Sequence, residues 1–217
     1  MISISNIITL IGAYLLGSIP SAVWVGLIFY KIDVREYGSG NAGATNTFRV
    51  LGWKAGIPVL AFDTFKGWAC VKLLVVILAR FNFVMEGSEE YMNVQLGSGI
   101  ACLMGHIFPI YAGFRGGKGV ATLLGLMLGI HPQAADICIL IFIGCLLITQ
   151  YVSLSSMIAG VSFPFILIYG YHNDFLILSL FSMLIAALVV VTHQKNIERL
   201  FLGAEPKAKI FRRKAKS

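Results

Sequence analysis

The sequence predicts an all-α, polytopic membrane protein with seven transmembrane helices, its N-terminus outside and its C-terminus inside the cell. Three observations predict this fold class. Of the 217 residues, 58% are hydrophobic and 12% are charged, whereas a soluble domain carries roughly 25% charged residues. Apolar runs long enough to cross a bilayer recur along the chain. Basic residues gather in alternate loops between these runs. A soluble enzyme is therefore excluded.

Each predicted span rests on a largely apolar run, and about 20 such residues cross the hydrocarbon core. The first run lacks a basic start and a small-residue cleavage site, so it is a retained helix and not a signal peptide. The fourth run is short, and His131-Pro132 separates it from the fifth. The predicted spans are 6–30, 55–80, 96–114, 119–131, 134–150, 154–172 and 174–193.

The basic residues set the orientation, because positively charged loops face the cytoplasm. Residues 31–54 hold four Lys or Arg side chains, the loop near 115–118 holds two, and the chain after 194 holds eight. Residues 81–95 hold three glutamates and no basic residue. If the fourth run did not cross, the basic tail would be exported, so it counts as a span. Residues 1–205 are the predicted membrane domain, and 206–217 are a basic cytoplasmic tail that anchors on anionic lipid.

Polar residues inside the spans are few. Asp63 and Lys66 are three positions apart in the second span, so they share a helix face and predict an internal ion pair that orders the bundle, with a direct catalytic role as the competing interpretation. His106, in the third span, is interpreted as a supporting residue. The four cysteines lie in apolar stretches without ligand-like spacing, so they are free thiols and no metal site is expected.

The first polar segment, residues 38–49, follows the first span. Its three glycines permit tight turns that present backbone N–H groups, and Arg49 offers a planar fork for a phosphate or carboxylate. A helical turn over 44–52 would also favour an anion at its N-terminus. An ordinary polar loop is the competing interpretation. Neutral hydrogen-bonding groups come from Ser39, Asn41, Thr45 and Asn46.

The second polar segment, residues 115–119, reads Arg-Gly-Gly-Lys-Gly and leads into a predicted helix. Glycine amides, the Lys118 charge and a helix N-terminus together favour phosphate binding. The segment lacks the spacing of a nucleotide-binding P-loop, so a nucleotide site is rejected. The competing interpretation is a loop whose positive charges only keep it on the cytoplasmic side of the membrane.

The third polar segment, residues 193–199, begins with a histidine at the cytoplasmic end of the last span. His193 and Asn196 are three apart and share a helix face. His193 is a candidate general base or phosphate ligand, and an interfacial polar residue is the equally weighted alternative. Gly203 is the expected helix stop before Glu205.

In this order and at this spacing, the segments resemble the acyl-phosphate-dependent glycerol-3-phosphate acyltransferases of bacterial membranes, the PlsY family. The resemblance covers about residues 10 to 205. It rests on Gly-Ser-Gly-Asn-Ala-Gly-Ala-Thr-Asn-x-x-Arg at 38–49, Gly-Gly-Lys-Gly-Val-Ala-Thr at 116–122, and His193-x-x-Asn196-Ile197-x-Arg199-Leu200-x-x-Gly203-x-Glu205, with Gly17-Ser18-Ile19-Pro20 and Asp63-x-x-Lys66-Gly67 in support. The chain departs from the family in its long acidic loop, in its long tail, and in Gln150, which replaces the basic residue expected before Tyr151.

The resemblance implies transfer of an acyl group from acyl phosphate to the 1-hydroxyl of sn-glycerol 3-phosphate, giving lysophosphatidate and phosphate, the first step of phospholipid synthesis. The reaction would take place on the cytoplasmic face of the bacterial plasma (inner) membrane. The implied catalytic residues are Ser39, Arg49, Lys118, His193, Asn196 and Glu205. The implied substrate- and phosphate-binding residues are Asn41, Thr45, Asn46, Gly116, Gly117, Gly119 and Ser153.

The expected partners are the two substrates and membrane lipid, with no cofactor, metal or nucleic acid, and the sequence indicates no oligomeric state. No Ser-His-Asp arrangement or His-x4-Asp motif occurs, so a covalent acyl-enzyme is not expected. The hydroxyl proton would pass to His193, to Glu205 or to the donor's own phosphate. The alternative function is a membrane transporter of phosphate or an organophosphate, although such transporters hold their site near the midplane between repeats.

Overall fold

The computed structural model describes residues 4–80, 85, 88–172 and 175–208, with the side chains of 78–80 left out. These residues form helices and connecting turns and contain no strand, which agrees with the predicted all-α class. The helices are α1 (Ile4–Gly17), α2 (Ser21–Val25), α3 (Ala44–Leu51), α4 (Trp53–Val71), α5 (Leu73–Arg80), α6 (Glu89–Ile107), α7 (Val120–Ile130), α8 (Pro132–Thr149), α9 (Val152–Phe165), α10 (Leu176–Thr192) and α11 (Gln194–Phe201). Short π-helical or 3-10 segments are η1 (Gly26–Tyr30), η2 (Val34–Glu36), η3 (Ile110–Ala112) and η4 (Ile166–Gly170).

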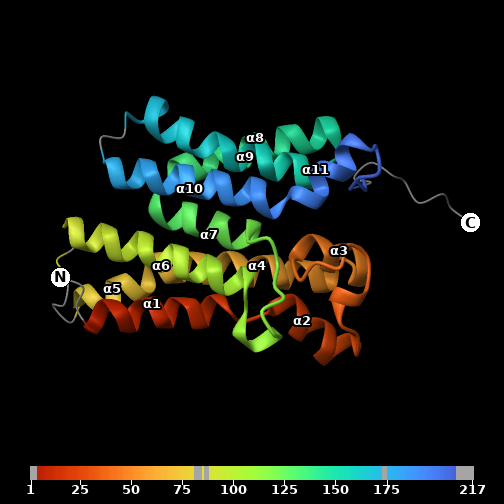
Figure 1. Ribbon diagram of the computed structural model, residues 1–217, viewed down its shortest axis with the longest axis horizontal. Helices are drawn as coiled ribbons and strands as arrows, with labels where there is room; N and C mark the ends of the chain where they lie inside the picture. Colours follow the sequence, from red (N-terminus) through yellow and green to blue (C-terminus); the bar gives the residue numbers. More distant parts are fainter. Residues whose placement is uncertain (1–3, 81–84, 86–87, 173–174, 209–217) are drawn as a thin grey trace, which may run out of the picture. The chain divides into compact units, whose positions relative to one another are not determined.

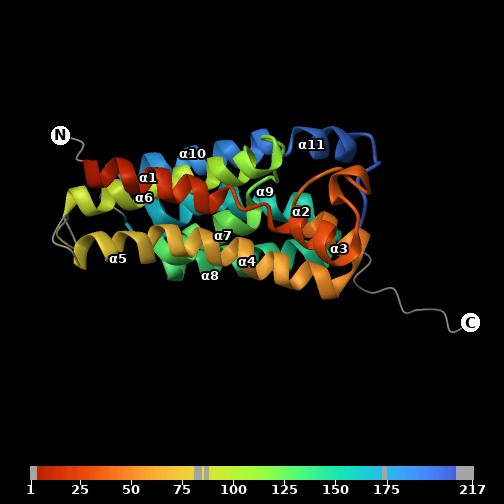
Figure 2. The ribbon, with the colours of Figure 1, turned by 90° about the horizontal axis from the view of Figure 1, so that it is seen from below.

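The chain divides into two compact units, Met1–Pro132 and Gln133–Ser217. In the first unit, α1 lies beside α6 and α4 lies beside α7 (Figures 1 and 2). Both pairs require glycine at the contact. A Cβ on Gly17 or Gly105 would collide with the backbone of the facing helix of the first pair, and a Cβ on Gly67 or Gly125 would do so in the second pair. Small residues that let helix backbones approach closely are typical of membrane helix packing.

A buried charged network lies inside the first unit and confirms the predicted ion pair. The Lys66 Nζ is 2.8 Å from the Asp63 Oδ1, and both side chains are almost fully buried. The Ser21 hydroxyl donates to the same Asp63 oxygen at 2.8 Å, and the His106 Nδ1 lies 3.7 Å from it. Lys66 also donates to the carbonyl of Ile19 at 3.0 Å. The network therefore ties α4 to α2, to α6 and to the break between α1 and α2.

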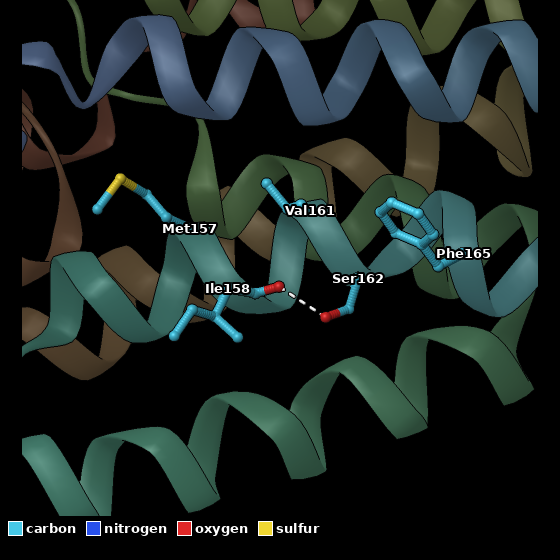
Figure 3. A pocket seen from close by; sticks show the side chains of 5 residues that line it. All are labelled: Met157, Ile158, Val161, Ser162 and Phe165. Atoms are coloured by element: carbon cyan, nitrogen blue, oxygen red, sulfur yellow. Dashed lines mark hydrogen bonds between the residues drawn. The ribbon is translucent and has the colours of Figure 1, made fainter.

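In the second unit, α9 packs against α10, and α11 is bent by 57° from α10. One face of α9 carries an apolar hollow of about 320 Å³ (Figure 3). The only serine on this face donates its hydroxyl to the Ile158 carbonyl of the same helix, which leaves the lining apolar. The hollow is lined by Met157, Ile158, Val161, Ser162 and Phe165.

By length and composition, four helical stretches of the described chain can cross a membrane, and the bent pair of α10 and α11 gives a fifth. The four are Ile4–Tyr30, Glu89–Ala112, Pro132–Thr149 and Val152–Gly170. α4 is long enough but carries Lys54, Asp63 and Lys66. α7 has 11 residues and so extends only about 16 Å, roughly half of the hydrocarbon thickness. The count of seven spans and their orientation therefore stay predictions.

Two sequence features fall partly outside the described residues. Glu86 of the acidic loop and the basic residues from Lys209 onward are not among them. Of the tail, Lys207 lies with its Nζ 5.4 Å from the centre of the Tyr151 ring, and the Ala208 amide donates to the Gln150 carbonyl at 2.8 Å. The start of the tail is thus attached to the turn between α8 and α9.

Candidate active site

The first polar segment folds around the buried side chain of Asn46. Its Oδ1 accepts hydrogen bonds from the Ser39 amide at 2.8 Å and the Ser39 hydroxyl at 3.1 Å. Its Nδ2 donates to the carbonyls of Val34 and Tyr37 at 2.8 and 3.1 Å. Gly38 and Gly40 have φ values of +62° and +72°, which glycine adopts without strain. Because the Asn46 amide is used internally, it holds Ser39 in place, a supporting role that differs from the direct phosphate binding expected of it.

Three side chains of this segment are exposed and available to a solute: Ser39, Thr45 and Arg49. The expected helical turn is α3, which begins at Ala44 and has no side-chain cap at its N-terminus. The first N–H groups of a helix lack intrahelical acceptors, so this end is able to accept an anion, and Arg49 lies in the last turn of the same short helix. Asn41 is half-buried in the turn before α3.

The second polar segment uses part of its backbone for its own fold. The Gly116 amide donates to the Ile107 carbonyl and the Gly117 amide to the His106 carbonyl, both at 3.1 Å. These two N–H groups were expected to bind phosphate, but in this structure they close the turn after α6. Gly119 has a φ of +82° and caps the N-terminus of α7. The remaining contributors from this segment are the half-buried Lys118 and the first-turn amides of α7.

Gly117 is also the point where the first two polar segments meet. A Cβ at this position would collide with the His106 ring and would stand 3.0 Å from the Ala42 carbonyl of the first segment. The opposite side of the His106 ring, at Nδ1, lies 3.1 Å from the Thr122 hydroxyl in α7. His106 therefore sits directly beneath the turn at Gly117, as expected of a residue that supports this turn.

The third polar segment places a buried histidine at the bend between α10 and α11. The His193 Nδ1 is 2.7 Å from the Val189 carbonyl, one turn earlier in α10. Because a carbonyl only accepts hydrogen bonds, Nδ1 carries the proton, and Nε2 of the neutral ring carries the lone pair. His193 is thereby oriented and held in one tautomer.

Glu205 is the centre of a network in the second unit. Its Oε1 accepts from the Ser153 hydroxyl and from the Asn196 Nδ2, both at 2.6 Å. Its Oε2 accepts from the Arg199 Nε at 2.8 Å. Gly203, with a φ of +67°, ends α11 and turns the chain back so that Glu205 meets α11. Ser153 lies in the first turn of α9, 52 residues away from Glu205.

The electrostatics of this network favour the carboxylate form. Burial raises the pKa of Glu205, but the hydrogen bonds from Ser153, Asn196 and Arg199 together lower it by more than burial raises it. The net result is a pKa below the ordinary value of a glutamate. A general base works best with a pKa near the working pH. Glu205 is therefore better suited to positioning its partners than to removing a proton.

The structure thus brings together two sets of predicted residues, one in each unit. The first unit assembles Ser39, Asn41, Thr45, Asn46, Arg49, Gly116, Gly117, Lys118 and Gly119. The second unit assembles Ser153, His193, Asn196 and Glu205.

Two arginines that bond to groups in or next to these sets were not predicted as site residues. Arg199 is three residues after Asn196, so a shared helix face was the available signal. Arg35 was counted only as a positive loop charge, yet it bonds the Ala112 carbonyl at 2.8 Å.

Comparison with known proteins shows which family the chain belongs to. The family model described as glycerol-3-phosphate acyltransferase matches residues 7–203. A relative from Listeria welshimeri, named glycerol-3-phosphate acyltransferase, is 44% identical over 197 residues, covering 91% of this chain and 93% of the relative. Glycerol-3-phosphate acyltransferase 2 of Bacillus anthracis is 42% identical over 203 residues, covering 93% and 98%.

Solved structures give the same result. The chain superimposes on a crystal structure of PlsY (YgiH), an integral membrane glycerol 3-phosphate acyltransferase, in its glycerol 3-phosphate form, with a TM-score of 0.79, 34% identity and coverage of 94% of this chain and 95% of that one. The lysophosphatidic acid form of the same enzyme gives a TM-score of 0.77 at 34% identity, again covering 94% and 95%. The chain therefore belongs to the glycerol-3-phosphate acyltransferase family and is an integral membrane acyltransferase of phospholipid synthesis.

Proposed function

We propose that this enzyme transfers a fatty acyl group from acyl phosphate to the 1-hydroxyl of sn-glycerol 3-phosphate, which yields lysophosphatidate and inorganic phosphate. The observation that carries the proposal is the Glu205 network. It gathers Ser153, Asn196 and Arg199 around one carboxylate at the end of α11. Four polar groups ordered beside a membrane-spanning helix are suited to holding a small polar substrate.

The first unit supplies the cations that two phosphate-bearing substrates need. Arg49 and Lys118 are the proposed phosphate ligands, and Ser39 and Thr45 present hydroxyl groups beside the exposed N-terminus of α3. Arginine binds phosphate through a planar fork, and lysine does so as a point charge. Gly119 and the first turn of α7 add backbone N–H groups.

In the proposed reaction, the 1-hydroxyl oxygen attacks the acyl carbon, the bond from that carbon to the phosphate oxygen breaks, and inorganic phosphate leaves. The mixed anhydride is already activated, so the enzyme contributes mainly by positioning and charge stabilisation. The hydroxyl proton passes either to the Nε2 of His193 or to the departing phosphate. Glu205 is less suited to accept it because its pKa is lowered.

The proposed topology has seven spans, with the N-terminus outside and the chemistry on the cytoplasmic face of the bacterial inner membrane. Its support is the distribution of basic residues between 31 and 54, at 115–118 and after 194. In this proposal residues 1–205 form the membrane acyltransferase domain. The basic residues from 206 onward bind the anionic lipid surface.

Purified protein in lipid vesicles tests the proposal through release of inorganic phosphate from palmitoyl phosphate. We expect release only when sn-glycerol 3-phosphate is also present, with lysophosphatidate formed in equal amount. Lys118→Ala should lower the rate by about a hundredfold, the loss typical of removing one transition-state charge contact.

The matched control is Lys54→Ala, which removes an exposed lysine that contacts only the neighbouring Trp53 ring among described residues. That variant should release phosphate at the wild-type rate. Phosphate release that does not require glycerol 3-phosphate, or activity with palmitoyl-CoA and none with palmitoyl phosphate, would contradict the proposed reaction.

A further inference from the structure

Residues 108–114 form a closed hairpin between the end of α6 and the second polar segment. The Phe114 amide donates to the Pro109 carbonyl at 2.8 Å, and the Ala112 amide donates to the same oxygen at 3.1 Å. Gly113 and Phe114 both have left-handed backbones, with φ of +63° and +59°. A bulky residue in this region is strained and persists only where the surrounding structure enforces it. The shape of the hairpin is therefore imposed by its neighbours.

Two side chains from other elements hold the hairpin. The Tyr14 hydroxyl of α1 donates to the Phe108 carbonyl at 2.9 Å. The Arg35 Nη1 donates to the carbonyls of Ala112 and Arg115 at 2.8 and 3.3 Å. The rest of the Arg35 guanidinium is fixed by the Asp33 carboxylate, with the closest contact at 2.7 Å. The carbonyls of Phe108, Pro109 and Ala112 thus all accept hydrogen bonds within the protein.

The large apolar side chains of the hairpin are exposed. Phe108, Ile110, Tyr111 and Phe114 are between 47% and 57% exposed. Trp24 lies beside them, with its ring centre 6.2 Å from that of Tyr111. Four neighbouring large apolar residues on one short loop are unusual on a water-exposed surface and mark an interaction surface.

The position of the hairpin identifies what it contacts. α6 has 19 residues and so extends about 28 Å, close to the hydrocarbon thickness of a bilayer. Glu89 and Glu90 lie in its first turn, so the hairpin stands at the opposite membrane interface. Trp24 is 41% exposed and is part of the apolar stretch Ile4–Tyr30, which is able to cross a membrane, so the hairpin continues the apolar surface of that stretch. Trp and Tyr are enriched at that depth.

We propose that the 108–114 hairpin is inserted in the membrane interface and is the place where the acyl donor passes from the lipid leaflet to the phosphate-binding turn. Lys118 lies four residues after the end of the hairpin, in the same continuous loop. A long-chain acyl phosphate that contacts the hairpin with its acyl chain keeps its head group at the membrane surface, near Lys118. The inference rests on the proposed function, since it names the route of that donor.

This route predicts different behaviour for the two substrates. Glycerol 3-phosphate is soluble and reaches the site from water, so its KM should not depend on the hairpin. Long-chain acyl phosphate is dissolved in the bilayer, so its KM should. A short, water-soluble donor such as butyryl phosphate bypasses the leaflet and should be used equally well with or without the apolar side chains.

The test is the variant Tyr111→Ser/Phe114→Asn in vesicles, with Tyr111→Ser alone as a milder form. Asn replaces Phe114 because it tolerates the left-handed backbone. We expect the KM for palmitoyl phosphate to rise about tenfold, the effect of losing roughly one buried aromatic contact with lipid. The KM for glycerol 3-phosphate and turnover with butyryl phosphate should be unchanged. The matched control, Trp53→Ser, removes another exposed aromatic residue and should change none of these values.

Two results would overturn the inference. An unchanged KM for palmitoyl phosphate would show that the hairpin does not contact lipid and would favour a protein partner on this surface. A parallel rise of both KM values together with lost butyryl phosphate turnover would show that the hairpin only shapes the site. Failure of the wild-type enzyme to use any acyl phosphate would instead reject the proposed function.

Discussion

Asp63 and Glu205 are both buried carboxylates with several hydrogen-bonding partners, but their surroundings differ. Asp63 lies in the middle of α4, where Lys66, Ser21 and His106 approach one of its oxygens. Its other oxygen, Oδ2, has no hydrogen-bond partner in the described part of the chain. Glu205 lies on an irregular segment after α11, and both of its oxygens are occupied.

The comparison shows that a buried carboxylate gains its role from its location. The Asp63 network joins helices within a membrane unit, where unpaired charge is very costly, so the bundle is stable only while its charges stay paired. The Glu205 network lies beside the bend of α10 and α11 and contains residues that the family resemblance implies for the reaction. It holds Ser153 of α9 and Asn196 of α11 in fixed positions around one carboxylate.

The largest expected effect is the loss of stability when the Asp63 network is broken on one side. Lys66→Met removes the cation and leaves a buried carboxylate without its main partner, which costs about 3–5 kcal/mol. The double variant Asp63→Leu/Lys66→Met removes both charges and should recover most of that loss. Thermal unfolding in detergent measures both effects.

Lys54→Met, at the exposed start of the same helix, is the control and should unfold at the wild-type temperature. If the double variant were as unstable as Lys66→Met, the instability of Lys66→Met would not come from an unpaired buried carboxylate, and this account of the Asp63 network would be wrong.

A smaller effect is expected for the pH dependence of the Glu205 network. Because the pKa of Glu205 is lowered in the folded protein, the stabilisation is fully present above the ordinary pKa of glutamate and is lost as the pH falls through the lowered value. Ser153→Ala removes one hydrogen bond that lowers this pKa. The pH at which the unfolding temperature falls on the acid side should therefore be higher in this variant than in the wild type, by about one unit or less.

Ser162→Ala is the matched control, because the Ser162 hydroxyl bonds only the Ile158 carbonyl of its own helix among described residues. Its unfolding temperature should follow the wild-type pH dependence. If the unfolding temperature of Ser153→Ala instead began to fall at a lower pH than that of the wild type, the Ser153 hydrogen bond would raise the pKa of Glu205, and this result would contradict the account of Glu205.

Local patterns in the sequence were sufficient for much of the fold. The pairing of Asp63 with Lys66 followed from helical spacing, and α3 and α7 begin where glycine-rich segments end. Such features depend on a few neighbouring residues, and their geometry is set by the helix itself. The count of spans depends on how long each helix is and how deeply it lies in the bilayer. The 11 residues of α7 are too few to show whether this helix crosses the membrane.

Contacts between distant segments were beyond the reach of the sequence pattern. Nothing local indicates that Ser153 bonds Glu205, because that contact depends on the turn at Gly203 and on the packing of α9. The sequence also suggested free amides at Gly116 and Gly117, whereas the carbonyls of His106 and Ile107 accept both. A glycine-rich segment shows that N–H groups are accessible in principle, and only the fold shows which of them are already bonded.

The most direct test of this division of roles is turnover per folded molecule, measured with the unfolding temperature on the same samples of Glu205→Gln and Asp63→Asn. The account predicts that Glu205→Gln lowers the unfolding temperature much less than Asp63→Asn does and loses phosphate release by about a hundredfold. It predicts that Asp63→Asn unfolds at a clearly lower temperature, while its folded fraction turns over near the wild-type rate. The reverse pattern, with an active Glu205→Gln or an inactive but stable Asp63→Asn, would contradict it.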